Sequence, residues 1–497
     1  MKKKVLSICM AMTAALALNA MDYTGTIQVT QNGQTSTGTA TFTVLNQENG
    51  DNLHTIEMHV PLMGNDLILR LFDVPSSSSS RITTYSAERN VTTDMGSMNT
   101  IVFARVIDGL MTANVAIPNQ GITMWFNTVG DHFQLPNSNM EAWTASNGEP
   151  DRWHGFKTAG GSFAGTSAAL VKLEQSNDVR QGATGHSAVM TANSIMSIVA
   201  NGTMTNGRLM AGSMSATSTL NHAEMDKSNG TDEFYMPLYA KPDKFNVWLK
   251  YTQGTANANN KASVSVKTFD GTYYQEPTDQ EYTNLSSSIV GGQITAGDWK
   301  QYSFPFDYDS YAANGAASEA IFVTFSTNGN PGQGSKNDAL YVDDMELVYL
   351  GNMTDLRYQG TTINGWNPAV TTYAMEMAGE PNLDDFTADI EGVSAVLTKS
   401  MEQNQDGSYR IAISVVAGDL QQAACYIINV TKPAAQITPG DVDDNGSVEI
   451  ADVSVLIDVL LSGNYEGINV LNADVDGNGE IGISDVSALI DILLQGN

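Results

Sequence analysis

Two acidic loops of twelve residues near the C-terminus constrain the fold of this chain more than any other feature. They cover residues 441–452 (DVDDNGSVEIAD) and 474–485 (DVDGNGEIGISD), so that equivalent positions lie 33 residues apart. Both read Asp-x-Asp-x-Asn-Gly and end with a carboxylate at position 12. Calcium takes about six to eight oxygen ligands, and a loop that wraps it needs a sharp turn midway, which glycine permits. The pattern therefore predicts two calcium loops.

One amphipathic helix is expected after each loop. The segments DVSVLIDVLL and DVSALIDILL carry apolar residues at i, i+3, i+4, i+7 and i+8, which is typical of a helix with one buried face. These residues are Val453, Leu456, Ile457, Leu460 and Leu461 in the first segment, and Val486, Leu489, Ile490, Leu493 and Leu494 in the second. No helix is expected before either loop, and AAQITPG upstream of the first contains both proline and glycine.

A duplicated loop and helix with no incoming helix, and with Asp at position 12, resembles the type I dockerin over residues 440–497. The resemblance implies two structural Ca²⁺ ions and a cohesin-like protein partner. The metal ligands that it implies are Asp441, Asp443, Asn445, Ser447 and Asp452, and then Asp474, Asp476, Asn478, Glu480 and Asp485. The partner-binding positions that it implies are Ile450, Ala451, Ile457, Ile483, Ser484 and Ile490. The alternative is a calcium-stabilised cap without a partner.

Acidic residues are concentrated in the same region. The whole chain has a formal net charge of −30, and residues 441–497 contain twelve carboxylates but no lysine or arginine. Such a segment repels itself unless cations neutralise it, so we expect calcium binding and folding to be coupled there. The acidity of the whole chain also argues against nucleic acid as a partner.

The N-terminal residues 1–20 (MKKKVLSICMAMTAALALNA) have the order of a secretory signal peptide, with three lysines, a short apolar run and small residues. The run is too short to span a membrane, and no later stretch is apolar enough to do so. We therefore expect a secreted protein, extracellular or at the cell surface, with lipidation at Cys9 as the minor alternative. Cleavage leaves Cys425 as the sole cysteine, expected to be a small buried hydrophobe without a disulfide.

Short apolar and polar alternations dominate the first 430 residues, so the expected fold class is mainly β. After the signal peptide we divide the chain into four modules. These are a β-barrel at 22–131, a jelly-roll sandwich at 132–350, a small immunoglobulin-like sandwich at 351–433, and the small α-helical dockerin with its linker at 434–497.

Three of these modules also resemble known families. The barrel, with DYTGTIQVT and GLMTANVAIP, resembles the calycin-like barrels of secreted Bacteroidales-type proteins, which either hold a small apolar ligand or are filled by side chains. The jelly roll, with E-x-W and P-D-x-W near its start and YVDDMEL near its end, resembles the "putative carbohydrate metabolism domain". The segment LRYQGTTINGWNP resembles the start of cadherin-like or immunoglobulin-like spacers.

These features favour a secreted, non-catalytic protein that engages a glycan through its jelly roll. Sugar rings stack on exposed aromatic faces, and Tyr273 and Tyr274 in FDGTYYQEP are the expected exposed platform, with Trp248 as a further candidate. Trp143, Trp153 and Trp299 are also available. For any one of these aromatics, packing in the core is the alternative.

Few features of the sequence indicate an enzyme, and we expect no catalytic residue. Familiar nucleophile, zinc and phosphate-binding motifs are missing from the sequence. Two alternatives nevertheless stay open. The first is a glycan-processing enzyme, an O-glycosyl hydrolase with its site in 132–350, where Asp343 with Asp344, or Glu141 with Asp151, are conceivable carboxylate pairs. The second is a structural adhesin or spacer.

Overall fold

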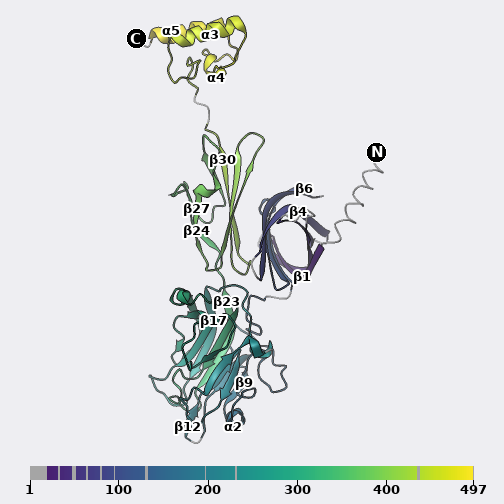
Figure 1. Cartoon of the computed structure of the whole chain (residues 1–497), viewed down its shortest axis with the longest axis vertical. Coiled ribbons are helices and arrows are strands. Elements are labelled where there is room, and N and C mark those ends of the chain that lie inside the picture. The colour runs from purple at the N-terminus through teal and green to yellow at the C-terminus, as the bar shows by residue number, and fades with distance from the viewer. Residues whose placement is uncertain are drawn as a thin grey trace, which may run out of the picture. The chain divides into compact units, whose positions relative to one another are not determined.

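The computed structural model describes residues 20–495 except for 32–33, 47–51, 63–64, 79–80, 94–95, 129–131, 196, 230–231 and 434–436. Apart from Ala20, the expected signal peptide lies outside the described residues. None of the helices in the described ranges is long and apolar enough to cross a bilayer. Most elements are strands, and the longer helices lie near the C-terminus (Figure 1), which confirms the expected fold class.

The first module is a closed barrel of eight antiparallel strands in simple up-and-down order, and β1 pairs with β8 to close it (Figure 1). The strands are β1 (Ala20–Gln31), β2 (Gln34–Asn46), β3 (Leu53–Leu62), β4 (Asn65–Ser78), β5 (Ile82–Thr93), β6 (Gly96–Ile107), β7 (Leu110–Ile117) and β8 (Ile122–Asn127).

Side chains of the barrel fill its own interior. Phe42 and Phe126 stack with ring centroids 4.3 Å apart, and Ile56, Met58 and Leu69 are fully buried around them. A barrel of about eight strands is just wide enough for side chains to fill. The packing agrees with a barrel filled by side chains rather than one built around a ligand.

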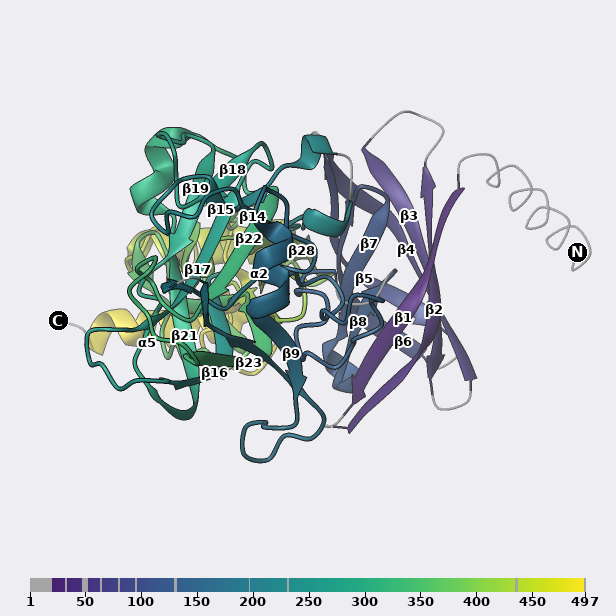
Figure 2. The ribbon, with the colours of Figure 1, turned by 90° about the horizontal axis from the view of Figure 1, so that it is seen from below.

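The second module is a β-sandwich whose ten main strands follow the order β13-β22-β17-β19-β21-β16-β23-β10-β9, with β20 paired to β17. Part of this order, β21-β16-β23, can be followed along one edge in Figure 2, with β9 beyond it. The elements are α2 (Ala164–Leu170), β9 (Lys172–Ser176), β10 (Ser187–Thr191), β11 (Asn193–Ile195), β12 (Ile198–Ala200), β13 (Thr203–Thr205), β14 (Arg208–Ala211), β15 (Asn221–Met225), β16 (Lys244–Thr252), β17 (Ala262–Phe269), β18 (Tyr274–Glu276), β19 (Leu285–Ile289), β20 (Gln293–Ile294), β21 (Gly297–Asp307), β22 (Ala320–Ser326) and β23 (Ala339–Val348).

A single apolar core lies between the two halves of this sandwich. Phe245 and Leu249 on β16 enter it from one half, and Val264 on β17 and Phe325 on β22 enter it from the other. The three-stranded sheet β14-β15-β18 adds a further layer. Alternation along β17 places Val264 and Val266 in the core and turns the residues between them to the opposite face.

The third module has two small sheets, β25-β24-β27 and β26-β30-β29-β28. Its strands are β24 (Asn352–Tyr358), β25 (Thr361–Thr362), β26 (Thr372–Glu376), β27 (Phe386–Glu391), β28 (Val396–Gln403), β29 (Tyr409–Val416) and β30 (Ala423–Thr431). Cys425 on β30 is half-buried, and burial raises the pKa of its thiol to about 11, which disfavours the thiolate.

The last module contains α3 (Ile450–Ser462), α4 (Val470–Ala473) and α5 (Ile483–Gln495); the first acidic loop leads into α3, and the second connects α4 to α5. The four-residue helix α4 corrects the expectation that no helix precedes either loop. Asn469 caps it, accepting hydrogen bonds from the backbone N–H groups of Leu471 and Asn472. A helix of one turn is too short to show a helical repeat of apolar residues, so the sequence pattern could not predict it.

Candidate calcium loops and a jelly-roll cavity

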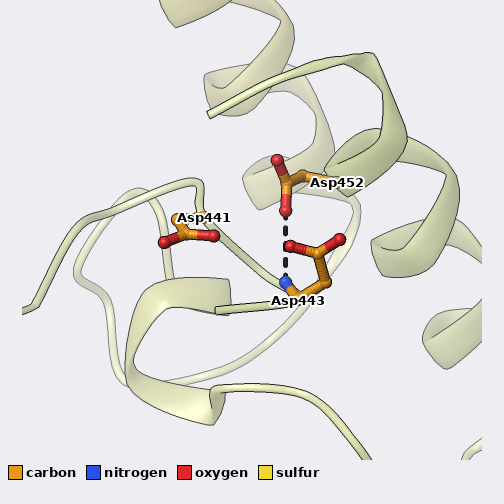
Figure 3. A group of neighbouring side chains, drawn as sticks. All are labelled: Asp441, Asp443 and Asp452. Carbon is orange, nitrogen blue, oxygen red and sulfur yellow. Dashed lines mark hydrogen bonds between the residues drawn. The ribbon is translucent and has the colours of Figure 1, made fainter. Parts of the chain in front are cut away.

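The first acidic loop brings three carboxylates together. Asp441, Asp443 and Asp452 each offer one oxygen, and these oxygens lie within 4.8 Å of one another (Figure 3). Backbone N–H groups of Asn445 and Gly446 donate to the Asp441 carboxylate at 3.0 and 2.9 Å. The Asp443 N–H donates to Asp452 Oδ1 at 3.1 Å. The loop backbone therefore positions these carboxylates at a common centre.

The second loop repeats this arrangement. Asp474, Asp476 and Asp485 offer oxygens that also lie within 4.8 Å of one another. The Gly479 N–H donates to Asp474 at 2.9 Å, and the Asp476 N–H donates to Asp485 at 3.0 Å. The 33-residue repeat in the sequence is thus a repeat of geometry.

Both clusters fit a calcium ion in their donor chemistry and backbone. All three donors in each cluster are carboxylate oxygens, which a hard cation such as Ca²⁺ prefers. Gly446 and Gly479 at loop position 6 have φ of +89° and +86°, a conformation that strains other residues. The other expected ligands, Asn445, Ser447, Asn478 and Glu480, lie at the exposed rim of the loops, and their role stays a prediction.

The carboxylate at loop position 12 has a second role at the start of each helix. Asp452 and Asp485 are the third residues of α3 and α5, and both are fully buried. Asp452 Oδ2 accepts the Glu449 N–H at 2.8 Å, and Asp485 Oδ2 accepts the Gly482 N–H at 2.8 Å. A carboxylate in the first turn stabilises a helix through its macrodipole. The same side chain therefore joins the ion cluster to the helix.

The buried face of these helices is narrower than the apolar stripe predicts. Leu456 and Val459 on α3 and Val486 and Leu489 on α5 are buried, together with Val442 from the first loop and Ala473 from α4. Several residues that we expected on the buried face are exposed instead: Ile457 at 40%, Leu461 at 82%, Ile490 at 41% and Leu494 at 71%. A module of two short helices offers only one neighbour to each, so part of the stripe stays uncovered.

Asn472 connects the two loops, a role that the motif does not reveal. Its side chain is fully buried, and its Nδ2 donates to the Asp441 carbonyl at 2.9 Å while its Oδ1 accepts the Thr438 N–H at 2.8 Å. The residue 33 positions earlier is Pro439, so only one half of the repeat has this clamp. In the sequence, only the Asn469-x-x-Asn472 spacing just before the second loop could have indicated this role of Asn472.

Replacing Asn472 by alanine is expected to lower the free energy of unfolding of this module by about 2 kcal/mol. The substitution leaves the Asp441 carbonyl and the Thr438 N–H without their buried partner, and an unpaired buried polar group costs about 1–3 kcal/mol. Thermal unfolding of the calcium-loaded protein, followed at 222 nm, measures the effect. Asn464→Ala, at an exposed position, is the control. An Asn472→Ala protein as stable as this control would contradict the clamp.

The residues implied to bind a partner lie at the surface of the last module. Ile450 and Ile483 are 77% and 82% exposed, Ala451 and Ser484 are exposed, and Ile457 and Ile490 are two-fifths exposed. Exposed isoleucines at equivalent positions of the two repeats are unusual for a surface that stays in water. Their binding role is not tested by the structure and stays a prediction.

The aromatic residues expected to contact sugar do not form an exposed platform. Tyr274 is only 2% exposed and packs against Phe269 and Phe322, which corrects its assignment. Tyr273 is partly buried, and its hydroxyl hydrogen-bonds Gln275. The ring of Trp248 has the Arg180 guanidinium over it, 5.1 Å from the ring centroid.

The other aromatics of the jelly roll also serve its structure. Trp153 is fully buried in the core, and its Nε1 donates to the Pro136 carbonyl. Trp143 Nε1 donates to the Met140 carbonyl, and Trp299 Nε1 donates to Asp178. Flanking sequence alone could not separate these buried rings from exposed ones.

A cavity of about 380 Å³ lies in the same module, and none of these aromatics lines it. Its floor is the outward face of β13, β22 and β17. Thr203 pairs with Ser326, and Ser326 pairs with Ser263, so one row of hydroxyl residues crosses all three strands. In the next row Thr324 pairs with Ser265. In the sequence, the period-2 alternation of serine and valine in KASVSVKT could have indicated this row of hydroxyl groups on one face of the sheet.

The walls of the cavity come from segments that cover this face. They include the segment before α2, the β11–β12 hairpin, β14 and β15, and the loop after β22. The apolar part of the lining includes Phe156, Phe163, Ile198, Met210, Met214 and Pro331. The polar part includes Asn201, Asn221, His222, Glu276 and Asn328. The site thus has an apolar wall facing a hydroxyl-rich floor.

The carboxylates considered for hydrolysis lie outside the lining of this cavity. Asp343 is buried and accepts the Asp344 N–H, and burial raises the pKa of Asp343 to about 7. Asp344 pairs with Arg180 at 2.6 Å. Glu141 accepts the His186 N–H, and Asp151 accepts the backbone N–H groups of Thr144 and Ala145, which precede it in the chain. These contacts stabilise loops and strand ends, and no catalytic role is shown.

Comparison with protein families assigns two of the modules. Residues 120–348 match the family described as "Putative carbohydrate metabolism domain", and residues 439–494 match the "Dockerin type I domain". Type I dockerin domains bind Ca²⁺, in agreement with the two acidic clusters. No curated protein matches the chain.

Comparison with solved structures gives matches at low identity and low TM-score. A putative glycoside hydrolase from Bacteroides thetaiotaomicron is 13% identical, with 60% of this chain and 88% of that chain covered and a TM-score of 0.32. The CBM22-1 xylan-binding domain from Paenibacillus barcinonensis is 12% identical, with 43% and 91% covered and a TM-score of 0.22. A family 22 carbohydrate binding module from Clostridium thermocellum is 10% identical, with 43% and 94% covered and a TM-score of 0.19.

Fold and loops together define a multimodular, mostly β protein with a carbohydrate-related module. More specifically, this chain carries a carbohydrate-metabolism domain of the matched family and a C-terminal type I dockerin domain.

Proposed function

We propose that this protein is a non-catalytic, extracellular component that its calcium-loaded dockerin tethers to a cohesin-like partner, while its jelly roll engages a polysaccharide. The observation that carries the proposal is the pair of carboxylate clusters, each closed by a buried aspartate at the start of a helix. We propose that each cluster binds one Ca²⁺ ion, two in all. Dockerin-bearing proteins are typically extracellular or surface-bound, which supports the expected secretion.

The tethering surface that we propose consists of the loop ends and the adjoining helix faces. Ile450 and Ile483 occupy equivalent exposed positions, as do Ile457 and Ile490. A partner can therefore contact either repeat with the same kind of residue, which permits two binding orientations. Residues 441–497 contain no lysine or arginine, so the partner surface should be apolar with a basic rim.

The polysaccharide role is supported by the family match over residues 120–348 and by the cavity within that module. The non-catalytic assignment is supported by the carboxylate pair considered for hydrolysis. Asp344 is paired with Arg180, and Asp343 is buried beside it in β23, so both side chains have structural surroundings. The hydrolase alternative makes a different prediction, since it requires release of reducing sugar from the bound polysaccharide.

Binding of the full chain to a panel of purified type I cohesin domains tests the tether. We expect binding in ~2 mM Ca²⁺, a concentration above the Kd of sensor-type calcium sites. We expect no binding in EDTA. Ile450→Asp or Ile483→Asp alone should retain binding through the other repeat, whereas the double variant should lose it. Val470→Asp, also at an exposed apolar position, is the matched control. Absence of calcium-dependent binding to every cohesin would overturn the tethering proposal.

A further inference from the structure

The cavity of the jelly roll has the features of a site for an uncharged, hydroxyl-rich ligand. We infer that it binds a neutral saccharide, with the hydroxyl rows of β13, β22 and β17 as its floor. The inference rests on the proposed polysaccharide role and adds to it the site and the chemical class of the ligand.

The floor presents hydroxyl groups that the protein does not use. Ser263 and Ser265 lie two residues apart on β17, on the face opposite to the core residue Val264. Within the described part of the chain their hydroxyls have no hydrogen-bond partner, whereas the Ser326 hydroxyl donates to the Asn328 carbonyl at 2.9 Å. Free hydroxyls in a row can both donate to and accept from the hydroxyls of a sugar.

Three further lining residues carry polar atoms that lack a partner. The atoms are Asn201 Oδ1, Asn328 Nδ2 and Glu276 Oε2, and each is shielded from solvent and without a hydrogen bond among the described residues. Buried polar groups in proteins are nearly always paired, so three exceptions around one cavity indicate a function. The set contains both a donor and acceptors.

The charge of the lining disfavours anionic ligands. None of the described residues that line the cavity is a lysine or arginine, and Glu276 is the single carboxylate among them. Lys267 approaches Glu276 at 4.0 Å from outside the lining and also donates to Ser288. A uronate or sulfate group would therefore find no lysine or arginine in the lining to pair with, and it would lie near the Glu276 carboxylate, whose partner Lys267 lies outside the lining. The lining favours an uncharged saccharide over an acidic one.

The apolar walls complement the other surface of a sugar. Phe156, Phe163 and Met210 line the cavity and remain partly exposed. The C–H surface of a sugar ring packs against aromatic and apolar side chains, while its hydroxyls reach polar neighbours. The volume of about 380 Å³ falls within the range of roughly 300–1,000 Å³ that is usual for small-molecule sites. The cavity therefore suits one end or a short stretch of a glycan chain.

Calorimetric binding to the full chain tests this inference. The probes are neutral oligosaccharides derived from xylan, β-glucan, mannan and galactan, with polygalacturonate and heparin as anionic probes. For the neutral sugar that binds, the Ser263→Ala/Ser265→Ala variant should weaken affinity at least about tenfold, because two hydroxyl contacts are lost. Ser265→Phe, which fills the cavity, should abolish binding. Ser303→Ala, an exposed serine of β21 outside the cavity, is the matched control and should bind normally.

The possible outcomes separate this inference from the proposed function. Loss of affinity in both cavity variants, with the control unchanged, supports the inference. Neutral-sugar binding that survives both variants would overturn the site while leaving the polysaccharide role intact. Binding to the anionic probes alone would overturn the ligand class. If no probe of either kind binds to the full chain, the polysaccharide role itself is wrong, and the inference is wrong with it.

Discussion

Removal of calcium from the full chain is expected to unfold the last module and leave the β modules folded. Residues 441–497 contain twelve carboxylates and no positive side chain, and the apolar core between α3 and α5 is small. Binding of an ion to the folded state alone adds about 2.7 kcal/mol per site at a hundredfold excess over Kd. Without that contribution, repulsion among the carboxylates should exceed what burial of a few side chains supplies.

Circular dichroism at 222 nm of the EDTA-treated chain, titrated with CaCl₂, measures this effect. We expect two bound ions, a gain of helix on binding, and a low thermal transition that rises with calcium concentration while the others stay constant. The double variant Asp452→Asn/Asp485→Asn should lose the gain. Asp458→Asn/Asp491→Asn removes the same charge from exposed positions of the same helices and should retain it. Helices that persist in EDTA would show that folding is independent of the ion.

The second large effect is expected from Trp153→Ala, which should lower the free energy of unfolding of the jelly roll by about 3–5 kcal/mol. The Trp153 ring is fully buried and lies 6.2 Å from the Phe325 ring, between centroids. Its Nε1 also donates to the Pro136 carbonyl, which the substitution leaves unpaired. The predicted loss combines a large cavity with a lost hydrogen bond.

Urea unfolding measures this loss. Circular dichroism is used to follow it instead of tryptophan fluorescence, because the substitution removes a tryptophan. Trp299→Ala is the control, because Trp299 is partly exposed, contacts Tyr341 edge-on and donates to Asp178 at the surface, and its loss should cost about 1 kcal/mol. A Trp153→Ala protein that is as stable as the control but has lost sugar affinity would show that the residue contacts ligand and not core.

The repeated loops illustrate what local sequence determines. Ligand spacing in Asp441–Asp452 depends only on residues within twelve positions of each other, and the backbone hydrogen bonds that orient the carboxylates are equally local. Strand alternation is also local, which is why the mainly β class and the barrel could be predicted from the sequence. Both features are properties of short segments.

Only the tertiary structure decided which side chains those segments bury and which they bring together. Tyr274 and Trp153 resemble exposed sugar platforms in the sequence, yet both lie in cores formed by distant strands. Ser263 and Ser326 are 63 positions apart, and only the pairing of β17 with β22 aligns them on one floor. Burial and long-range register depend on the whole chain packing at once, whereas a metal-binding loop or an alternating strand is encoded within a dozen residues.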